Sequence, residues 1–255
     1  MKKILVRTLK LLDLGSAIAV RLTKWTGKSK TPVHPKHFLE KKPWFTHHLS
    51  KKDIIIDLGS GNGQNAIKSA NFCRKVIAAE IDTNLIEIAK ITAKTKKIFN
   101  IKFETADLEK KLIYKNNSFD KVLFLDVLEH LTKRGQILSE IKRITKPDGL
   151  LLIGVPNSQS SWKKLQRSAG LCSFSDPDHK VEFSQKSIKK LLQKHHFKIL
   201  EFGYGKYDTP LRGVIDIIGG FSIRLYRKIS KWRQKKALLE PREASGFEIV
   251  AKNFK

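Results

Sequence analysis

The segment from Ile54 to Gly63 constrains the fold of this chain more than any other. An apolar run that contains Asp57 leads into Gly59-Ser60-Gly61-Asn62-Gly63, where glycines alternate with small polar residues. This pattern predicts a buried parallel strand that turns through a tight loop into a helix. Glycines in such a loop let backbone N–H groups approach a ligand closely at the helix N-terminus.

Strand-like and helix-like patterns alternate from Asp53 onward, which predicts a doubly wound α/β domain around a parallel sheet. Strands are predicted at 53–58, 75–81, 100–105, 120–126, 149–155, 197–203 and 246–253, and helices at 63–71, 83–97, 133–145, 184–195 and 211–236. The Gly219-Gly220 pair is predicted to bend or split the last of these helices.

The chain divides into a helical N-terminal extension, residues 1–50, and a core, residues 51–255, with an insert at 206–245 before the last strand. Two segments, 2–25 and 211–236, carry apolar residues at helical spacing with many Lys and Arg between them. Each has a tryptophan near its end, Trp25 or Trp232. We keep three roles open for them: docking on an anionic membrane, contact with RNA phosphates, or cover for the sheet.

Acidic residues stand where the predicted strands end, and ligands of open α/β sheets bind beyond these ends. Asp57 ends the first strand, where it would repel a phosphate and attract an ammonium or sulfonium group. Glu80 ends the second strand, where a carboxylate can accept hydrogen bonds from ribose hydroxyls. A dinucleotide-binding loop would carry a third glycine where this chain has Gln64, and its pyrophosphate disfavours Asp57.

Two further motifs complete a family pattern: Glu104-Thr105-Ala106-Asp107-Leu108 and Asp126-Val127-Leu128-Glu129-His130-Leu131. With them, residues 51–200 and the last strand resemble the class I S-adenosylmethionine-dependent methyltransferases, in particular the ubiquinone-pathway and small-molecule branch. The resemblance implies a Rossmann-like, seven-stranded, mostly parallel sheet with a reversed last strand, and S-adenosyl-L-methionine as cofactor. The cofactor-binding residues that it implies are Asp57, Gly59, Ser60, Gly61, Gly63, Glu80, Ile81, Asp107, Leu108 and Asp126.

Two histidines are candidates for a catalytic base near the methyl-transfer corner that the resemblance places at Asp126. His130 directly follows that corner, and His179 lies in Asp176-Pro177-Asp178-His179, before a predicted helix. A hydroxyl or amine acceptor needs such a base. The structural alternative is that His130 packs or caps a helix and that His179 fixes a loop.

No metal site is expected in the preferred interpretation. Asp126, Glu129, His130 and His179 nevertheless resemble the two acids and two histidines that hold a divalent metal in small-RNA 3′-end 2′-O-methyltransferases. Carboxylates with imidazoles can bind Mg²⁺ or Mn²⁺. An RNA 2′-O-methyltransferase with a divalent metal therefore stays open as an alternative.

The charge balance favours anionic partners. The chain has 51 Lys and Arg against 24 acids, a formal net charge of +27. Such a field attracts nucleic acid, an anionic membrane surface or an acidic substrate, although solvated surface lysines explain it equally well.

These observations predict an enzyme that methylates a small-molecule or lipid-linked acceptor, at oxygen. The alternatives are the RNA methyltransferase and a non-catalytic basic module that binds nucleic acid or membrane. Cys73 and Cys172 are too few for a disulfide framework, and charged residues interrupt the apolar start of the chain. We therefore expect a cytoplasmic protein, with peripheral membrane contact as an option. The acceptor and the oligomeric state do not follow from the sequence.

Overall fold

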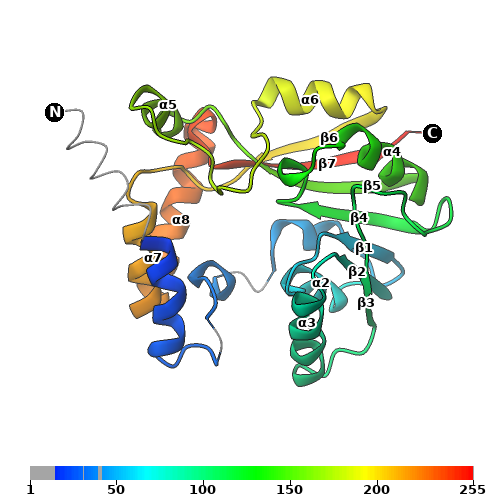
Figure 1. Cartoon of the computed structure of the whole chain (residues 1–255), viewed down its shortest axis with the longest axis horizontal. Helices are drawn as coiled ribbons and strands as arrows, with labels where there is room; N and C mark the ends of the chain where they lie inside the picture. Colours follow the sequence, from blue (N-terminus) through cyan, green and yellow to red (C-terminus); the bar gives the residue numbers. More distant parts are fainter. Residues whose placement is uncertain (1–14, 31, 40–41, 255) are drawn as a thin grey trace. The chain divides into compact units, whose positions relative to one another are not determined.

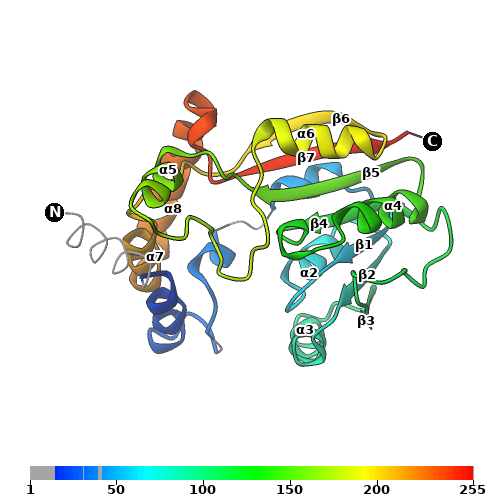
Figure 2. The same ribbon diagram turned by 45° about the horizontal axis from the view of Figure 1, so that its top comes forward.

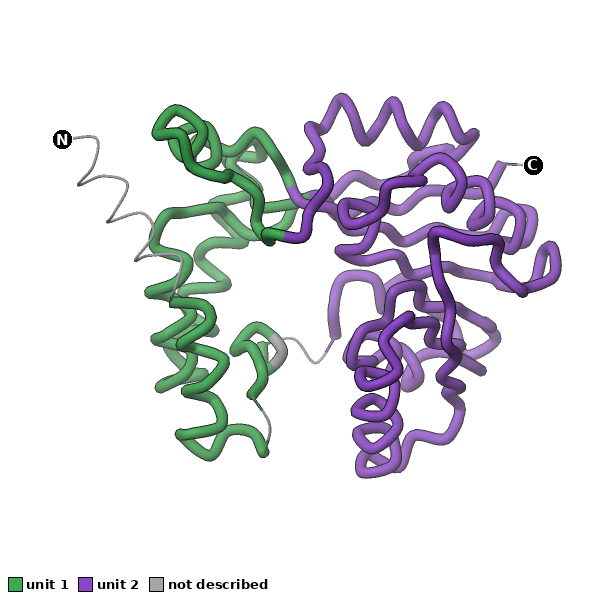
Figure 3. Tube along the Cα trace, viewed as in Figure 1, with its two compact units in different colours: residues 1–41, 157–177, 204–246 green, residues 42–156, 178–203, 247–255 purple. Residues whose placement is uncertain are grey.

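The computed structural model describes residues 15–30, 32–39 and 42–254. The chain forms two compact units, which Figure 3 colours separately. Unit 1 consists of residues 1–41, 157–177 and 204–246, and unit 2 consists of residues 42–156, 178–203 and 247–255. The predicted boundary after residue 50 and the predicted insert at 206–245 stay predictions, and the first part of the predicted helix 2–25 lies outside the described residues.

A seven-stranded sheet forms the centre of unit 2, in the order β3-β2-β1-β4-β5-β7-β6 (Figure 1). The strands are β1 (Ile54–Leu58), β2 (Lys75–Glu80), β3 (Ile101–Thr105), β4 (Phe119–Leu125), β5 (Thr145–Pro156), β6 (Phe197–Tyr204) and β7 (Gly246–Asn253). The first five are parallel to their neighbours, and the direction reverses at β7. This arrangement confirms the predicted Rossmann-like fold with a reversed last strand.

The strand order changes direction at β1. The chain builds β2 and β3 on one side of β1 and then returns to add β4 and β5 on the other side. The loops that leave β1 and β4 therefore diverge at the carboxyl edge of the sheet. A crevice at such a switch point is where open α/β sheets bind ligands.

The helices of unit 2 flank this sheet (Figure 2), and each has a set of buried residues. They are α2 (Gln64–Ala70), α3 (Thr83–Thr95), α4 (Arg134–Ile144) and α6 (Gln185–Lys194), with 3₁₀ turns η2 (Trp44–His48) and η3 (Leu128–His130). In α3, Ile86, Ala89 and Ala93 are buried at helical spacing, while the Asp82 carboxylate accepts the backbone N–H of Asn84 at 2.8 Å and begins the helix.

The fifth strand is longer than predicted. The sequence places a strand at 149–155 after a helix that reaches 145, but α4 ends at Ile144 and β5 begins at Thr145. Thr145 is fully buried and pairs with Phe119 of β4. Because of this pairing, Thr145 belongs to the strand and the helix ends one residue earlier. The register of this pair shifts between Phe119 and Lys121, which accommodates the Pro147-Asp148-Gly149 irregularity inside the strand.

Unit 1 is helical. It contains a helix at residues 15–25, then η1 (Pro35–Phe38), α5 (Ser161–Ser168), α7 (Arg212–Phe221), α8 (Ile223–Leu239) and η4 (Pro241–Glu243). Helix α5 was not predicted, because its eight residues are mostly polar and only Trp162 and Leu165 are apolar. Within the described residues, no helix has the length and apolar character needed to cross a membrane.

The predicted helix 211–236 is split into α7 and α8, which confirms the predicted split, but the break lies at Ser222, two residues after the glycine pair. Ser222 has extended backbone, φ −139° and ψ 101°, and its hydroxyl accepts the Leu225 N–H to begin α8. The two glycines are helical, and their neighbours leave no room for a side chain at either position. A Cβ on Gly219 would lie 2.6 Å from Pro35 Cβ, and one on Gly220 would lie 2.7 Å from Leu22 Cβ.

The glycine loop after β1 needs its glycines for two different reasons. Gly61 and Gly63 have φ of +53° and +75°, a region that costs other residues about 1 kcal/mol or more. A Cβ on Gly61 would meet no atom within 4 Å, whereas one on Gly63 would lie 2.8 Å from Ala89 Cβ and 3.1 Å from Phe103. Gly63 therefore serves the packing of α3 and β3 against the loop.

Gly63→Ala is expected to destabilise the fold more than Gly61→Ala. Both variants carry the left-handed backbone cost of about 1 kcal/mol, and Gly63→Ala adds an overpacking cost of about 1–3 kcal/mol. Urea unfolding followed by circular dichroism measures both, provided that the slopes agree. Equal losses in the two variants would show that Ala89 and Phe103 do not hold the loop.

Candidate functional site

The Glu80 side chain at the end of β2 holds the glycine loop. Its Oε2 accepts the Gly61 N–H at 2.7 Å, and its Oε1 accepts the Ile81 N–H at 2.8 Å and the Asp82 N–H at 3.1 Å. The backbone N–H groups of Gly59 and Ser60 also donate to the Ala79 carbonyl. Because a carboxylate oxygen has two lone pairs, Oε2 can still accept a ligand hydroxyl, and the ribose role of Glu80 stays a prediction.

Asp57 is a buried acid at the end of β1. Its residue is 2% exposed, and its Oδ2 atom has no hydrogen-bond partner in the structure. Burial raises the pKa of the Asp57 carboxyl, the backbone hydrogen bond of Ala66 lowers it, and the nearby Glu80 charge raises it, so that the pKa lies at about 7. A buried polar atom without a partner is costly, so this oxygen suits a ligand donor or cation.

Beside Asp57, the loop itself is shaped for a ligand. The Ser60 hydroxyl is buried and has no partner, as is the Asp57 Oδ2 atom. The space where a Cβ of Gly61 would stand is open. On the β2 side, Ile81 is 61% exposed, although it is a large apolar residue. The loop thus has two buried polar atoms without a partner beside open space at Gly61, and the predicted cofactor contacts of Gly59, Ser60, Gly61, Gly63 and Ile81 stay predictions.

The next two predicted residues follow β3. Asp107 is half-buried, and the Glu109 N–H and then the Lys110 ammonium lower the pKa of its carboxyl. Its Oδ1 accepts the Glu109 N–H at 2.9 Å, which makes a local turn. Leu108 is buried at 8% exposure. The structure thus gives Asp107 a local structural role, and the predicted adenine contacts of Asp107 and Leu108 stay predictions.

Asp126 directly follows β4, and its predicted cofactor contact stays a prediction. It has a left-handed backbone, φ +57°, which is uncommon for a residue other than glycine, and its side chain is exposed. Its N–H donates to the Gly154 carbonyl of β5 at 3.0 Å. The next residue, Val127, lies against the glycine loop, since a Cβ on Gly59 would stand 2.6 Å from its Cγ2. The β1 loop and the β4 corner are therefore in direct contact.

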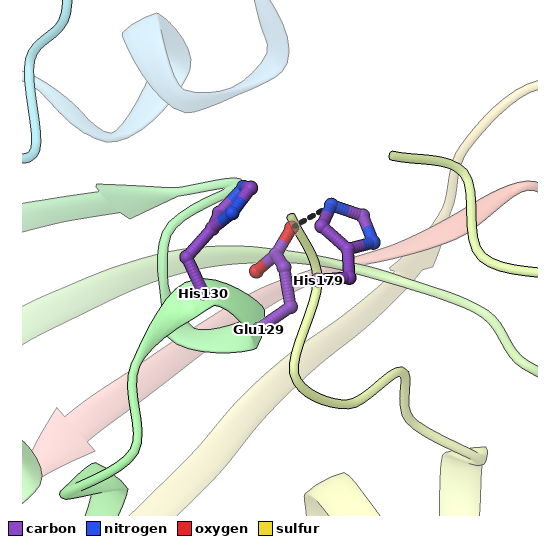
Figure 4. A group of neighbouring side chains, drawn as sticks. All are labelled: Glu129, His130 and His179. Carbon is purple, nitrogen blue, oxygen red and sulfur yellow. Dashed lines mark ion pairs between the residues drawn. The ribbon is translucent and has the colours of Figure 1, made fainter. Parts of the chain in front are cut away.

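Both predicted histidines meet beyond this corner, as Figure 4 shows. The rings of His130 and His179 are 4.6 Å apart and nearly perpendicular. Glu129 lies between them, with its Oε1 3.8 Å from His179 Nε2. The ligand atoms of Glu129, His130 and His179 all lie within 4.8 Å of one another. Asp126, the fourth residue of the predicted metal alternative, is not part of this group.

Backbone hydrogen bonds bring His179 to the corner from a distant part of the sequence. The N–H groups of Lys180 and Val181 donate to the Glu129 carbonyl at 2.8 and 3.3 Å. Glu182, which the sequence analysis missed, then places its Oε1 3.0 Å from His179 Nδ1. Both side chains are buried. The His-x-x-Glu spacing of 179 and 182 was the one sequence signal, and it has no meaning until the loop is folded.

A hollow lies at the opposite edge of the sheet, where the parallel strands begin. It has a volume of about 390 Å³ and is lined by Asp53, Asp120, Lys121 and Lys146, among others. These charges pair with one another: Lys146 with Asp120 at 2.7 Å, and Lys121 with Asp53. Paired charges far from the glycine loop indicate a structural network.

Comparison with known proteins agrees with the geometry at the carboxyl edge of the sheet around the glycine loop, which we call the glycine edge. A family model described as a methyltransferase domain matches residues 49–203, more than half of the chain. The chain belongs to the class I S-adenosylmethionine-dependent methyltransferases. This family uses S-adenosylmethionine as cofactor, and membership in it counts against the non-catalytic alternative of the sequence analysis.

Relatives of this methyltransferase are similar over part of their length. The ubiquinone biosynthesis O-methyltransferase of Bartonella bacilliformis is 27% identical over 154 residues, which cover 58% of this chain and 60% of the relative. A ubiquinone/menaquinone biosynthesis C-methyltransferase of Francisella tularensis is 31% identical over 112 residues, which cover 41% of this chain and 43% of the relative. The chain thus spans about half the length of these relatives.

A solved S-adenosylmethionine-dependent methyltransferase of Methanosarcina mazei has the same fold. It superposes with a TM-score of 0.57 at 19% identity and covers 83% of this chain and 97% of its own. At this identity the likeness shows the fold alone.

Replacing Asp57 with Asn is expected to flatten the pH dependence of S-adenosylmethionine binding by the methyltransferase. The pKa of Asp57 lies at about 7. The wild-type carboxyl therefore gains a proton as the pH falls from about 7 to 5, and cation affinity falls by up to about tenfold per pH unit. Isothermal titration calorimetry measures the Kd in this range, below the titration of the ligand's amino group.

The folding stability of the ligand-free enzyme has the opposite pH dependence from its cofactor affinity. Because the folded pKa of Asp57 exceeds the unfolded one, its contribution to stability is present at low pH and is lost as pH rises through about 7. The Asp57→Asn variant lacks this contribution to the pH dependence of stability.

The binding experiment has a clear contradicting outcome. If the variant kept the wild-type pH dependence of the Kd for S-adenosylmethionine, Asp57 would not be the acid that faces the cofactor.

Proposed function

We propose that this enzyme transfers a methyl group to an oxygen of a small-molecule or lipid-linked acceptor, with His179 as the general base. The observation that carries the proposal is the 3.0 Å contact between His179 Nδ1 and Glu182 Oε1 beside the β4 corner. An ionised carboxylate only accepts hydrogen bonds, so Nδ1 carries the proton of that bond. Nε2, which lies 3.8 Å from Glu129 Oε1, is then the nitrogen that can accept a proton from an acceptor hydroxyl bound beside that carboxylate.

The remaining residues bind and align the reactants. S-adenosylmethionine supplies a methyl group already activated on a sulfonium, so the protein's task is mainly alignment and exclusion of water. Asp57, Ser60, Gly61 and Glu80 would hold the cofactor at the glycine edge. Val127 joins that edge to the histidine pair, because it lies against Gly59 and two residues before Glu129.

The proposal that oxygen is the methylated atom depends on His179 as the base, and a relative supports it. An imidazole held by a carboxylate suits the deprotonation of a hydroxyl. The Bartonella relative is named for O-methylation, whereas the Francisella relative is named for C-methylation. A carbon acceptor would be activated by its own chemistry and would depend less on His179.

The direct experiment uses the full chain with methyl-labelled S-adenosylmethionine and separate aqueous and lipid extracts of cells. Mass spectrometry should find labelled products in one extract, each with the methyl group on oxygen. The label should be absent with Asp57→Asn, because the cofactor site is then impaired. Labelled RNA with no labelled small molecule or lipid would reject the proposal.

His179→Ala is expected to lower kcat by about 10²- to 10⁴-fold while the Kd for S-adenosylmethionine stays unchanged, because the loss concerns proton transfer. Glu182→Gln keeps a hydrogen-bonding group but removes the charge, so a smaller loss in kcat is expected. His195, at the end of α6, offers the matched control, and His195→Ala should keep wild-type turnover. Unchanged turnover in His179→Ala would remove it from catalysis.

A second candidate is an RNA 2′-O-methyltransferase with a divalent metal. Glu129, His130 and His179 favour it, since their ligand atoms lie within 4.8 Å of one another, and the net charge of +27 suits RNA. Carboxylate with two imidazoles is a donor set that Mn²⁺ or Mg²⁺ can use. In this alternative the three residues hold the metal, and none of them acts as the base.

Chelation separates the two candidates. With His179 as base, turnover is expected to survive EDTA followed by gel filtration, because no step needs a metal. Loss of turnover that Mg²⁺ or Mn²⁺ restores would favour the metal candidate. A Ca²⁺ control, which prefers more oxygen ligands, distinguishes a specific site from general salt effects.

A further inference from the structure

The exposed side of α8 carries a row of large apolar residues in unit 1. Leu225, Trp232 and Leu239 recur every seven residues, about two helical turns, so they line one side of the helix. They are 47%, 57% and 83% exposed. The sequence analysis kept open the possibility that the apolar residues of segment 211–236 cover the sheet. The structure instead buries Tyr226, Ser230, Arg233 and Ala237 of α8 and leaves the row to solvent.

A basic row runs beside the apolar row. Arg224, Lys228, Lys231 and Lys235 are exposed and follow one another at three or four residues, the spacing of neighbours on a helix face. No acidic residue occurs between Ile223 and Leu239. The exposed side of α8 therefore combines apolar side chains with unopposed positive charge over about four turns.

The helix at residues 15–25 repeats the arrangement. Ile18 and Trp25 are seven residues apart and are 47% and 77% exposed, and Arg21 and Lys24 are exposed beside them. This helix packs on α7 in the same unit. The Thr26 hydroxyl donates to the Gly220 carbonyl at 3.0 Å, and Gly15 lies so close to Gly213 that a Cβ would stand 2.5 Å from its carbonyl carbon.

Close glycine contacts explain why the large apolar residues face outward. The helix 15–25 meets α7 through Gly15, Gly213 and Gly220, where there is no room for a side chain. In α7, Val214 and Phe221 are 41% and 56% exposed. Helix 15–25 thus packs on α7 through small residues, and Ile18, Trp25, Val214 and Phe221 remain exposed.

We propose that unit 1 docks on the surface of a membrane that contains anionic lipids. Rows of Trp and Leu suit the apolar side of the headgroup region, and adjacent Lys and Arg side chains reach lipid phosphates. A second copy of this chain would place basic rows of equal charge against each other. RNA would use the basic row and could stack on Trp232, but it gains little from Leu225 and Leu239.

The docking surface lies in unit 1, whereas the cofactor edge and the histidine pair lie in unit 2. The proposal therefore does not rest on the proposed function, and each can fail alone. If both hold, the enzyme meets its acceptor at the membrane, which makes a lipid-linked acceptor the natural substrate class.

Co-sedimentation of the full chain with vesicles tests the docking. We expect binding to vesicles with about 30% phosphatidylglycerol, weak binding to pure phosphatidylcholine, and partial release at about 0.5 M salt. The double variants Leu225→Ala/Trp232→Ala and Lys228→Glu/Lys231→Glu should each lower the partition coefficient at least about tenfold.

Matched variants in unit 2 control for general effects of charge and apolar area. Ile91 and Ile113 are 66% and 81% exposed, and Lys94 and Lys96 are exposed. Ile91→Ala/Ile113→Ala and Lys94→Glu/Lys96→Glu should keep wild-type vesicle binding. Unchanged S-adenosylmethionine affinity and circular dichroism would show that all four variants are folded.

Three results would overturn the docking proposal. The first is no binding to anionic vesicles at low salt. The second is an equal loss in the unit 1 and unit 2 variants, which would indicate attraction by net charge alone. The third is an RNA gel shift that the α8 variants abolish, without any vesicle binding, which would assign the surface to nucleic acid.

Discussion

The parallel pairing of β1 with β2 on one side and β4 on the other is the constraint on which the site depends. Parallel strands bring their carboxyl ends to one edge, so Asp57, Glu80 and Asp126 meet there although they are far apart in the sequence. The loop after β1 must turn sharply between its two neighbours, and Glu80 secures it by accepting the Gly61 N–H. Any shift in this pairing would separate the acids from the loop.

The same edge concentrates acids in a strongly basic protein. Asp57 and Glu129 are 2% and 1% exposed, and Glu80 stands close enough to raise the pKa of Asp57. Burial makes each charge costly unless a partner compensates it, and a cationic ligand is such a partner. The site therefore favours a sulfonium cofactor over a pyrophosphate, whereas the remaining surface attracts anions.

The two units divide the properties of the enzyme. Unit 2 holds the sheet, the cofactor edge and the histidine pair. Unit 1 holds helices that meet through glycines and expose their large apolar residues beside basic rows. In unit 1, Asp216 is buried and accepts hydrogen bonds from Ser16 and Tyr226, with His34 Nε2 at 3.2 Å. This polar centre ties the helix 15–25 to α7 and α8, so the exposed rows belong to a fixed framework.

Local patterns of apolar residues, glycines and acids encode the α/β fold, the strand–glycine–helix unit and the cofactor class, so these could be predicted from the sequence. Which residues come into contact depends instead on the folded chain. Glu182 becomes the partner of His179 because backbone hydrogen bonds draw residues 180 and 181 to Glu129. Thr145 belongs to β5 because it pairs with Phe119 of β4. Gly219 and Gly220 lie inside α7, where Pro35 and Leu22 leave no room for a side chain. Contacts between distant segments set these outcomes, and no local pattern contains them.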